Sequence, residues 1–231
     1  MRSIRALFNK AIKKEILDSK YYPFKNFKIK TVHTINRTLT IEEMKRIINL
    51  ELISGSLIWH HRNLFLLSFC LIGINFSDLL TLNKLCFVDG RIVFRRKKTN
   101  KVYTILLQQE AIKIFHYYIK SQKDSKESVL PFVVNKNDPK LLKKDILQAI
   151  KNTNDYLKKI AALCNIEKQL TTYYARYSWA NIARGLGYSK DLIAEALGHE
   201  YGNKVTGVYL DYYSNEIIDE MNKKVNNVTF N

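Results

Sequence analysis

The sequence predicts a mainly helical protein that carries one small three-stranded antiparallel sheet, an α+β fold. The 231 residues include only 3 prolines and 8 glycines, so long stretches contain no residue that breaks a helix. Apolar residues recur at helical spacing along most of the chain. Residues 86–106 differ, because short apolar runs alternate there with turn residues, as is typical of strands.

The N-terminal segment is expected to form a helix followed by a linker. Its apolar residues at helical spacing are Ile4, Leu7, Phe8, Ala11 and Ile12. Such a stripe must pack on a partner. Residues 21–24 should end the helix, because the residue before Pro23 avoids the helical region. Residues 25–37 are basic and lack periodicity, which favours a linker.

Several later helices have predictable ends. Thr40 and Glu43 form a capping box, which predicts a helix from about Ile41, and Ser77 is expected to cap a short helix over residues 77–82. The expected N-caps and C-terminal stops of later helices are Thr171, Ser189, Gly187 and Gly198. The other expected helices span residues 59–71, 109–120, 140–164, 172–186, 190–197, 204–211 and 215–225.

Residues 86–106 are expected to form the sheet. Asp89-Gly90 stands between two apolar runs, which is a strong hairpin signal. A second turn at Thr99-Asn100 leads into residues 102–106. The cations around this second turn are Arg95, Arg96, Lys97, Lys98 and Lys101.

The charge balance indicates a polyanionic partner. The net charge is +17, from 38 Lys and Arg against 21 Asp and Glu, which favours phosphate binding with counterion release. Charge alone leaves DNA, RNA and a membrane surface open. No apolar stretch reaches the roughly 18 residues of a spanning helix, and residues 1–14 are basic without the long apolar run that is typical of a signal peptide. The cysteines (Cys70, Cys86, Cys164) lack CxxC spacing, which favours a reduced cytosolic protein without a cysteine-bound metal.

A tyrosine, a histidine and an arginine mark the candidate site. Tyr209 follows His199 by ten residues, and Arg176 precedes His199 by twenty-three. A phenol can attack a phosphate once it loses its proton, and an arginine can hold two phosphate oxygens. By residue type alone, each could instead be structural, since the chain has 14 tyrosines. In a strongly basic chain the set suggests chemistry on a DNA phosphate.

Residues 37–231 resemble the catalytic domain of tyrosine recombinases, the phage integrase family, and most of all the integrases of Bacteroidetes mobile elements. The resemblance implies the fold of that catalytic domain. The segments that carry it, in this order, are Gly73-Ile74-Asn75-Phe76-Ser77-Asp78-Leu79-Leu80, Arg95-Arg96-Lys97-Lys98-Thr99, Ala175-Arg176-Tyr177-Ser178-Trp179-Ala180, Leu197-Gly198-His199 and Gly202-Asn203-Lys204-Val205-Thr206-Gly207-Val208-Tyr209.

The resemblance implies site-specific DNA recombination or integration through a covalent 3′-phosphotyrosine, with no metal and no other cofactor. Tyr209 would be the nucleophile, and Arg176 and His199 would hold the phosphate. Lys98 would protonate the leaving oxygen. Lys97 stays an alternative, because adjacent strand residues face opposite ways and at most one of the two points into the cleft.

Two positions depart from the family pattern. Asn75 stands where the family usually has an arginine, so a permanent cation and a bidentate clamp are missing. Tyr173 stands at a family histidine, and its phenol is a poor base near neutral pH. Another cation, Arg62 or a hairpin lysine, is expected to serve instead. Asp78 is expected to support the site structurally.

The resemblance also implies domains and partners. Residues 1–36 would be the last helix of a truncated core-binding domain plus a linker, and residues 37–231 the catalytic domain. The partners would be double-stranded DNA, further copies of the chain in a tetramer and a DNA-bending accessory protein, with no membrane, in the cytoplasm of a bacterium at its nucleoid. Residues 214–231 are expected to dock on a neighbouring protomer or to pack in cis. The alternatives are a DNA-binding relative without catalysis and a basic helical protein that binds RNA.

Overall fold

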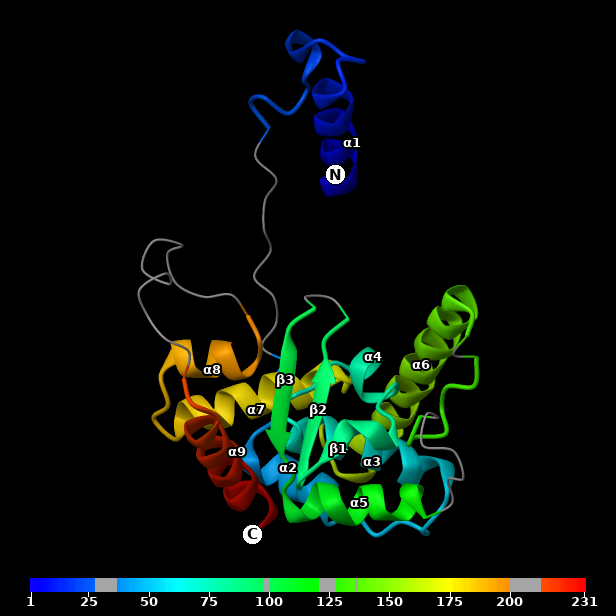
Figure 1. The fold of residues 1–231 in the computed structure, drawn as a ribbon, viewed down its shortest axis with the longest axis vertical. Coiled ribbons are helices and arrows are strands. Elements are labelled where there is room, and N and C mark those ends of the chain that lie inside the picture. The colour runs from blue at the N-terminus through cyan, green and yellow to red at the C-terminus, as the bar shows by residue number, and fades with distance from the viewer. Residues whose placement is uncertain (28–36, 98–99, 121–127, 136, 200–212) are drawn as a thin grey trace. The chain divides into compact units, whose positions relative to one another are not determined.

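The computed structural model describes residues 1–27, 37–97, 100–120, 128–135, 137–199 and 213–231 (Figure 1). The chain divides into two compact units, Met1–Asn36 and Arg37–Asn231.

The first unit is a helix with a short return segment. Helix α1 (Arg2–Lys13) ends earlier than expected, and a 3-10 turn, η1 (Ser19–Tyr21), follows it. Glu15 has a positive φ of 57°, which turns the chain back before the proline is reached. Within this unit the Phe8 and Phe24 rings meet edge to face at 5.9 Å.

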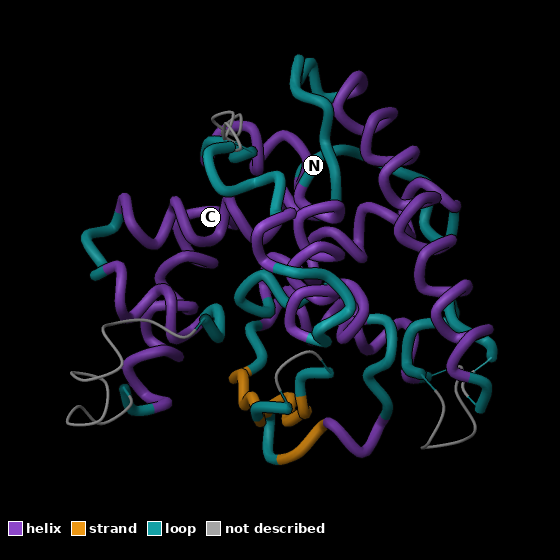
Figure 2. Tube along the Cα trace, turned by 90° about the horizontal axis from the view of Figure 1, so that it is seen from above, coloured by secondary structure: helices purple, strands orange, loops and turns teal. Residues whose placement is uncertain are grey.

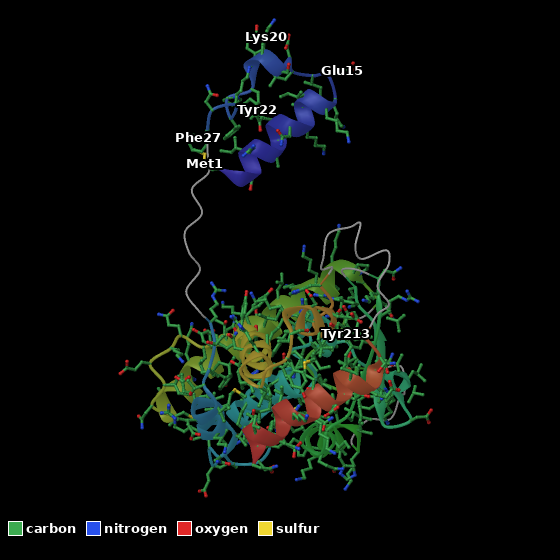
Figure 3. The ribbon with its side chains drawn as sticks, turned by 90° about the vertical axis from the view of Figure 1, so that its left-hand side faces the viewer. Met1, Glu15, Lys20, Tyr22, Phe27 and Tyr213 are labelled. Atoms are coloured by element: carbon green, nitrogen blue, oxygen red, sulfur yellow. The ribbon has the colours of Figure 1, made fainter. Side chains whose placement is uncertain are left out.

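The return segment covers only part of the α1 stripe. Arg5 Nε donates to Tyr22 Oη at 3.0 Å, and Figure 3 shows Tyr22 beside the helix. Ile4 and Leu7 remain exposed. Part of the apolar stripe therefore has no cover within the described part of this unit.

The second unit is built around α3 (Leu57–Cys70). The second half of this helix is buried on all sides, in a continuous run from Asn63 to Cys70, as a central helix requires. Helices α5, α6 and α7 contact it. The surrounding elements are α2 (Ile41–Ile48), α4 (Phe76–Leu79), η2 (Lys84–Cys86), α5 (Gln109–Ile119), α6 (Pro139–Leu163), α7 (Tyr173–Gly185), α8 (Lys190–Ala196) and α9 (Asn215–Phe230).

The predicted three-stranded sheet is confirmed. Strands β1 (Phe87–Val88), β2 (Arg91–Arg95) and β3 (Val102–Leu106) pair antiparallel in the order β1-β2-β3. Asp89 and Gly90 both have positive φ, 47° and 73°, which two-residue hairpins of type I′ require. Figure 2 shows the strands together at one side of the helices.

The capping box of α2 is confirmed, whereas the expected cap of α4 is wrong. Thr40 Oγ1 accepts from the Glu43 N–H at 3.1 Å, and Glu43 Oε2 accepts from the Thr40 N–H at 2.7 Å. Helix α4 begins one residue before Ser77, because Asn75 is its N-cap and accepts from the Ser77 N–H at 3.4 Å. Asparagine and serine both suit this position, and the earlier one takes it.

The ends of the later helices agree with the sequence except at α7 and α9, and α9 runs to Phe230 instead of ending near residue 225. Ser189 Oγ accepts from the Leu192 N–H at 3.2 Å. Thr172, rather than Thr171, precedes α7 and makes no side-chain cap bond. Gly187 and Gly198 have positive φ, 90° and 71°, and end their helices as predicted. The helix expected over residues 204–211 lies outside the described residues.

Helix α9 packs within its own chain, against α2, α7 and β3 (Figure 1). Met221 and Val225 are fully buried. Arg91 binds the Asp219 carboxylate through both terminal nitrogens, at 2.7 and 3.0 Å. Of the two expectations for residues 214–231, the structure contains the packing in cis. None of the described helices is both long and apolar enough to cross a membrane.

Candidate active site

A cavity of about 290 Å³ brings together four of the predicted site residues from distant parts of the sequence. Asn75 comes from the start of α4, Tyr173 and Arg176 from the first turns of α7, and His199 from the end of α8. The residues that line the cavity are Ser68, Ile74, Asn75, Phe76, Arg96, Ile150, Thr172, Tyr173, Arg176, Tyr177, Ala180, Leu197 and His199.

Main-chain carbonyls hold the Arg176 guanidinium in place. Nη1 donates to the Gly73 carbonyl at 2.7 Å, and Nη2 donates to the Leu197 carbonyl at 2.5 Å. Gly73 is required for this approach, because a Cβ there would lie 2.6 Å from the Arg176 Cα. Its φ of +61° also favours glycine. The backbone thus fixes the direction of the guanidinium before any ligand binds.

Burial and a second cation weaken the proton affinity of Arg176. Together they lower its pKa to about 10, with burial as the main cause and the positive charge of Arg96 as the next. The guanidinium remains charged at neutral pH. Two like charges that perturb one another in a single cavity are stabilised when an anion binds between them.

His199 is placed by the end of α8. The Gly198 N–H donates to the Glu195 carbonyl at 2.7 Å, and the His199 N–H donates to the Ala194 carbonyl at 2.8 Å, which is the Schellman pattern. His199 Nε2 lies 3.2 Å from Arg176 Nη2. Arginine can only donate, so a hydrogen bond here makes Nε2 the acceptor and puts the ring proton on Nδ1.

Asn75 and Tyr173 offer neutral groups. The Asn75 Oδ1 atom accepts from the Ser77 N–H at 3.4 Å and from Ser77 Oγ at 3.3 Å, so its NH2 group is the part suited to a phosphate. Tyr173 is exposed and its ring lies 6.4 Å from that of Tyr177. Neither side chain replaces the charge that a family arginine would bring.

Arg62 and Lys97, two cations that the sequence suggested for the site, do not line the cavity. Arg62 donates to the Leu50 carbonyl at 2.5 Å and does not line the cavity, so it was the wrong candidate. Lys97 also does not line it and faces a separate pocket that Arg95 shares. Lys98 and Tyr209 lie outside the described residues.

Arg96 directly follows β2 and was not predicted as a site residue. It lines the cavity, and its Nη1 donates to the Gly198 carbonyl at 3.1 Å. A signal for it exists in the sequence. Alternate strand residues face the same side, so Arg96 shares the core side of the strand with Ile92 and Phe94.

Asp78 connects the hairpin to α4. Its Oδ1 accepts from the Lys97 N–H at 3.3 Å. Burial raises its pKa, while this hydrogen bond and the nearby charges of Arg96 and Arg176 act in the opposite direction. The contact agrees with the structural role expected from the sequence. Among the described residues, no group of three His, Cys, Asp or Glu could hold a metal.

Comparison with known proteins gives a family and a fold. The family model described as the phage integrase family matches residues 37–216. A lambda integrase dimer bound to a COC′ core site superposes with a TM-score of 0.61 at 16% identity, covering 91% of this chain and 71% of that one. The XerA recombinase gives 0.52 at 16% identity, covering 92% and 70%.

A transposon integrase is similar to the same extent. The Tn1549 integrase in complex with circular intermediate DNA gives a TM-score of 0.55 at 14% identity, covering 96% of this chain and 76% of that one. No curated protein matches the sequence. At these identities the solved structures establish the fold, a mainly helical domain with a three-stranded antiparallel sheet.

Proposed function

The chain belongs to the phage integrase family, because the family model matches residues 37–216, and on this premise we propose that the cavity around Arg176 binds the phosphate at which the protein cuts DNA. The protein is a tyrosine recombinase, an enzyme that breaks and rejoins DNA in site-specific recombination. The residues that carry out the reaction, and the partners on DNA, are the subject of the proposal.

The observation that supports the proposal best is the fixed guanidinium of Arg176. A guanidinium has five N–H groups, and its contacts with Gly73, Leu197 and His199 use at most three. At least two N–H groups have no partner among the described residues and can donate to the non-bridging oxygens of a phosphate. Donors that are held before the substrate arrives stabilise the transition state without reorganisation.

The proposed reaction uses Tyr209 as the nucleophile. Its hydroxyl releases its proton to water, its oxygen attacks the phosphorus, the bond to the 5′-oxygen breaks, and a 3′-phosphotyrosyl bond forms. Lys98 gives its proton to the leaving oxygen, so that a 5′-hydroxyl is released. A 5′-hydroxyl of another strand then attacks the phosphotyrosine and frees Tyr209. The positions of both residues in the family's motifs support these two roles.

The remaining site residues donate hydrogen bonds to the same phosphate. His199 donates from its ring, Tyr173 from its hydroxyl and Asn75 from its NH2 group. All three line the cavity with Arg176. Neutral donors orient a phosphate but do not balance its charge, so Arg176 and Lys98 are assigned the larger roles.

The proposed partner is double-stranded DNA, in keeping with the net charge of +17. The lambda integrase structure is a dimer on a core site, and the Tn1549 integrase structure contains DNA. We also propose a tetramer on DNA, a DNA-bending accessory protein and a location at the bacterial nucleoid. Residues 1–36 would then be the last helix of a core-binding domain with its linker, and residues 37–231 the catalytic domain.

A covalent-adduct assay tests the function. The chain is incubated with a pool of nicked duplexes whose sequence around the nick is randomised, and adducts are isolated on a denaturing gel and sequenced. The nick lets the cut fragment diffuse away, so the phosphotyrosine accumulates. Wild type and Tyr213→Phe, a neighbouring tyrosine that serves as the control, should form adducts, and Tyr209→Phe should form none. Adducts that persist in Tyr209→Phe would assign the nucleophile elsewhere. A wild type that binds DNA without any adduct would favour the non-catalytic alternative.

A further inference from the structure

We propose that Arg96 supplies the second guanidinium of the phosphate site. It would provide the positive charge that Asn75 lacks. This inference rests on the proposed function of the cavity. It adds a catalytic residue from the hairpin, at a position to which the resemblance assigns no role.

Arg96 and Arg176 bind two consecutive carbonyls at the end of α8. Arg176 Nη2 donates to the Leu197 carbonyl at 2.5 Å, and Arg96 Nη1 donates to the Gly198 carbonyl at 3.1 Å. His199 follows in the chain and lines the same cavity. The end of α8 therefore presents two guanidinium groups and one imidazole to a single space.

Positive charge exceeds negative charge among the described residues of this cavity, which favours the binding of an anion. Among the described residues, neither Arg96 nor Arg176 forms an ion pair with a carboxylate. Asp78 is the acid that lies in the field of both, and its burial disfavours its charged form. In the part of the chain that the structure describes, two cations thus face at most one carboxylate, so a phosphodiester with its single negative charge fits the balance.

The base of the hairpin holds Arg96 firmly. Its N–H donates to the Lys101 carbonyl at 2.9 Å, and its carbonyl accepts from the Asn100 N–H at 2.8 Å. The neighbouring Lys97 N–H is bound to Asp78 at 3.3 Å. The Arg96 side chain therefore starts from a backbone that is held by hydrogen bonds on both sides, so it is better preorganised than a side chain on an unpaired loop.

The other described cations of the hairpin face elsewhere. Arg95 and Lys97 are exposed and line a separate pocket. Asn75, in turn, uses its oxygen to cap α4. Arg96 is thus the hairpin cation that the described residues place beside Asn75 and Arg176.

The first test compares adduct formation by Arg96→Gln, Arg96→Lys and Arg184→Gln. Arg184 is an exposed arginine in the last turn of α7, so its loss controls for one positive charge. Removal of one preorganised donor costs about 10²–10³-fold in rate, and this loss is expected for Arg96→Gln. Arg96→Lys should fall between, because it keeps the charge and loses the fork. Arg184→Gln should stay within about twofold of wild type. An Arg96→Gln rate equal to that of Arg184→Gln would refute the proposal.

A neutral substrate separates charge stabilisation from a structural role. At the cut site mapped with the pool, a methyl group replaces one non-bridging oxygen, which removes the negative charge of the phosphate. If Arg96 balances that charge, the defect of Arg96→Gln should shrink at least tenfold on this substrate. A defect of the same size on both substrates would mean that Arg96 only supports the fold, and would overturn the assignment.

Sulfate binding keeps the inference testable if the proposed function fails. If wild type forms no adduct, the melting temperatures of the same variants are measured against sulfate at constant ionic strength. Wild type and Arg184→Gln should be stabilised progressively by sulfate, and Arg96→Gln should lose most of this response. An equal sulfate response in all three proteins would show that Arg96 does not contribute to an anion site.

Discussion

The two sides of α7 differ in how their polar and charged groups are paired. On the core side, polar groups are paired: Trp179 Nε1 donates to Asn222 Oδ1 at 2.8 Å, and Ser178 Oγ accepts from the Leu39 N–H at 2.9 Å. On the cavity side, Arg176 faces another cation, Arg96, and its only described bonds to the protein go to two carbonyls and an imidazole.

The difference separates stability from function along one helix. Buried and paired polar groups fix a helix firmly, whereas like charges in a cavity work against folding until a ligand binds. The core side therefore holds α7 so that the cavity side can keep its charges close together. Variants on the two sides should affect different measurements.

The largest effect should come from the cavity side. Arg176→Ala should slow adduct formation by about 10³-fold, about 4 kcal/mol in the barrier, because the fixed donors are lost. The free energy of unfolding should change far less, since relief of the repulsion with Arg96 offsets the lost hydrogen bonds. Both quantities are measured on the same protein, by the adduct assay and by urea titration. A loss of stability as large as the loss of rate would remove the contrast between the two sides.

Substitution of Gly198 tests the end of α8, whose carbonyls accept hydrogen bonds from both guanidinium groups. A Cβ at this position would lie 1.2 Å from the Tyr103 hydroxyl, and φ is +71°. Gly198→Ala should cost about 3 kcal/mol or more of stability from strain and displacement. The matched control is Gly187→Ala, where φ is +90° and nothing lies within 4 Å of the added Cβ. It should cost about 1–2 kcal/mol from strain alone. Equal losses in urea titrations would mean that Tyr103 yields freely.

Asn222 tests the core side. It accepts from Trp179 Nε1 at 2.8 Å and donates to the Cys70 carbonyl at 2.9 Å, so Asn222→Ala leaves two buried groups unpaired. A loss of about 2–3 kcal/mol is expected, with the adduct rate of the folded protein within about threefold of wild type. Asn227→Ala, an exposed asparagine on the same helix, should change stability by less than about 0.5 kcal/mol. A catalytic loss in Asn222→Ala at full folding would show that the two sides are coupled.

The smallest expected effect is a pH dependence of the packed interior. Burial, with the nearby His60 as a further cause, lowers the pKa of His61 to about 4. The folded protein keeps His61 neutral, whereas the unfolded chain takes up a proton below about pH 6.5. Stability from this group is thus complete above pH 6.5 and is lost as the pH falls towards 4, by about 2 kcal/mol at about pH 5. His61→Gln should flatten this part of the curve, and exposed His116→Gln should not. An unchanged slope in His61→Gln would place the acid sensitivity elsewhere.

Much of the fold follows from local patterns. The Thr40–Glu43 capping box and the Asp89-Gly90 hairpin are confirmed, because each depends on residues a few positions apart. The cap of α4 was wrong by two residues, since Asn75 and Ser77 are both good caps and the choice depends on tertiary packing. The early end of α1 depends on a left-handed residue, Glu15, for which the side chain gives no signal.

The candidate site was predictable where motifs mark it and not where a distant segment completes it. Arg176 and His199 lie together as their motifs imply. The expectation for Arg62 was wrong because this residue belongs to the central helix α3. Its guanidinium donates to the Leu50 carbonyl instead of lining the cavity. Arg96 was missed because it reaches the cavity from the hairpin, far in sequence from Asn75 and Arg176, and only the alternation along β2 points to it.

The two consecutive carbonyls at the end of α8 have a mechanical consequence. Leu197 and Gly198 tie α7 and the hairpin to one short piece of backbone. A rotation of the peptide between them would change both hydrogen bonds at once. In sequence this piece lies shortly before Tyr209, the proposed nucleophile, so any displacement of its backbone would move the partners of both guanidinium groups together.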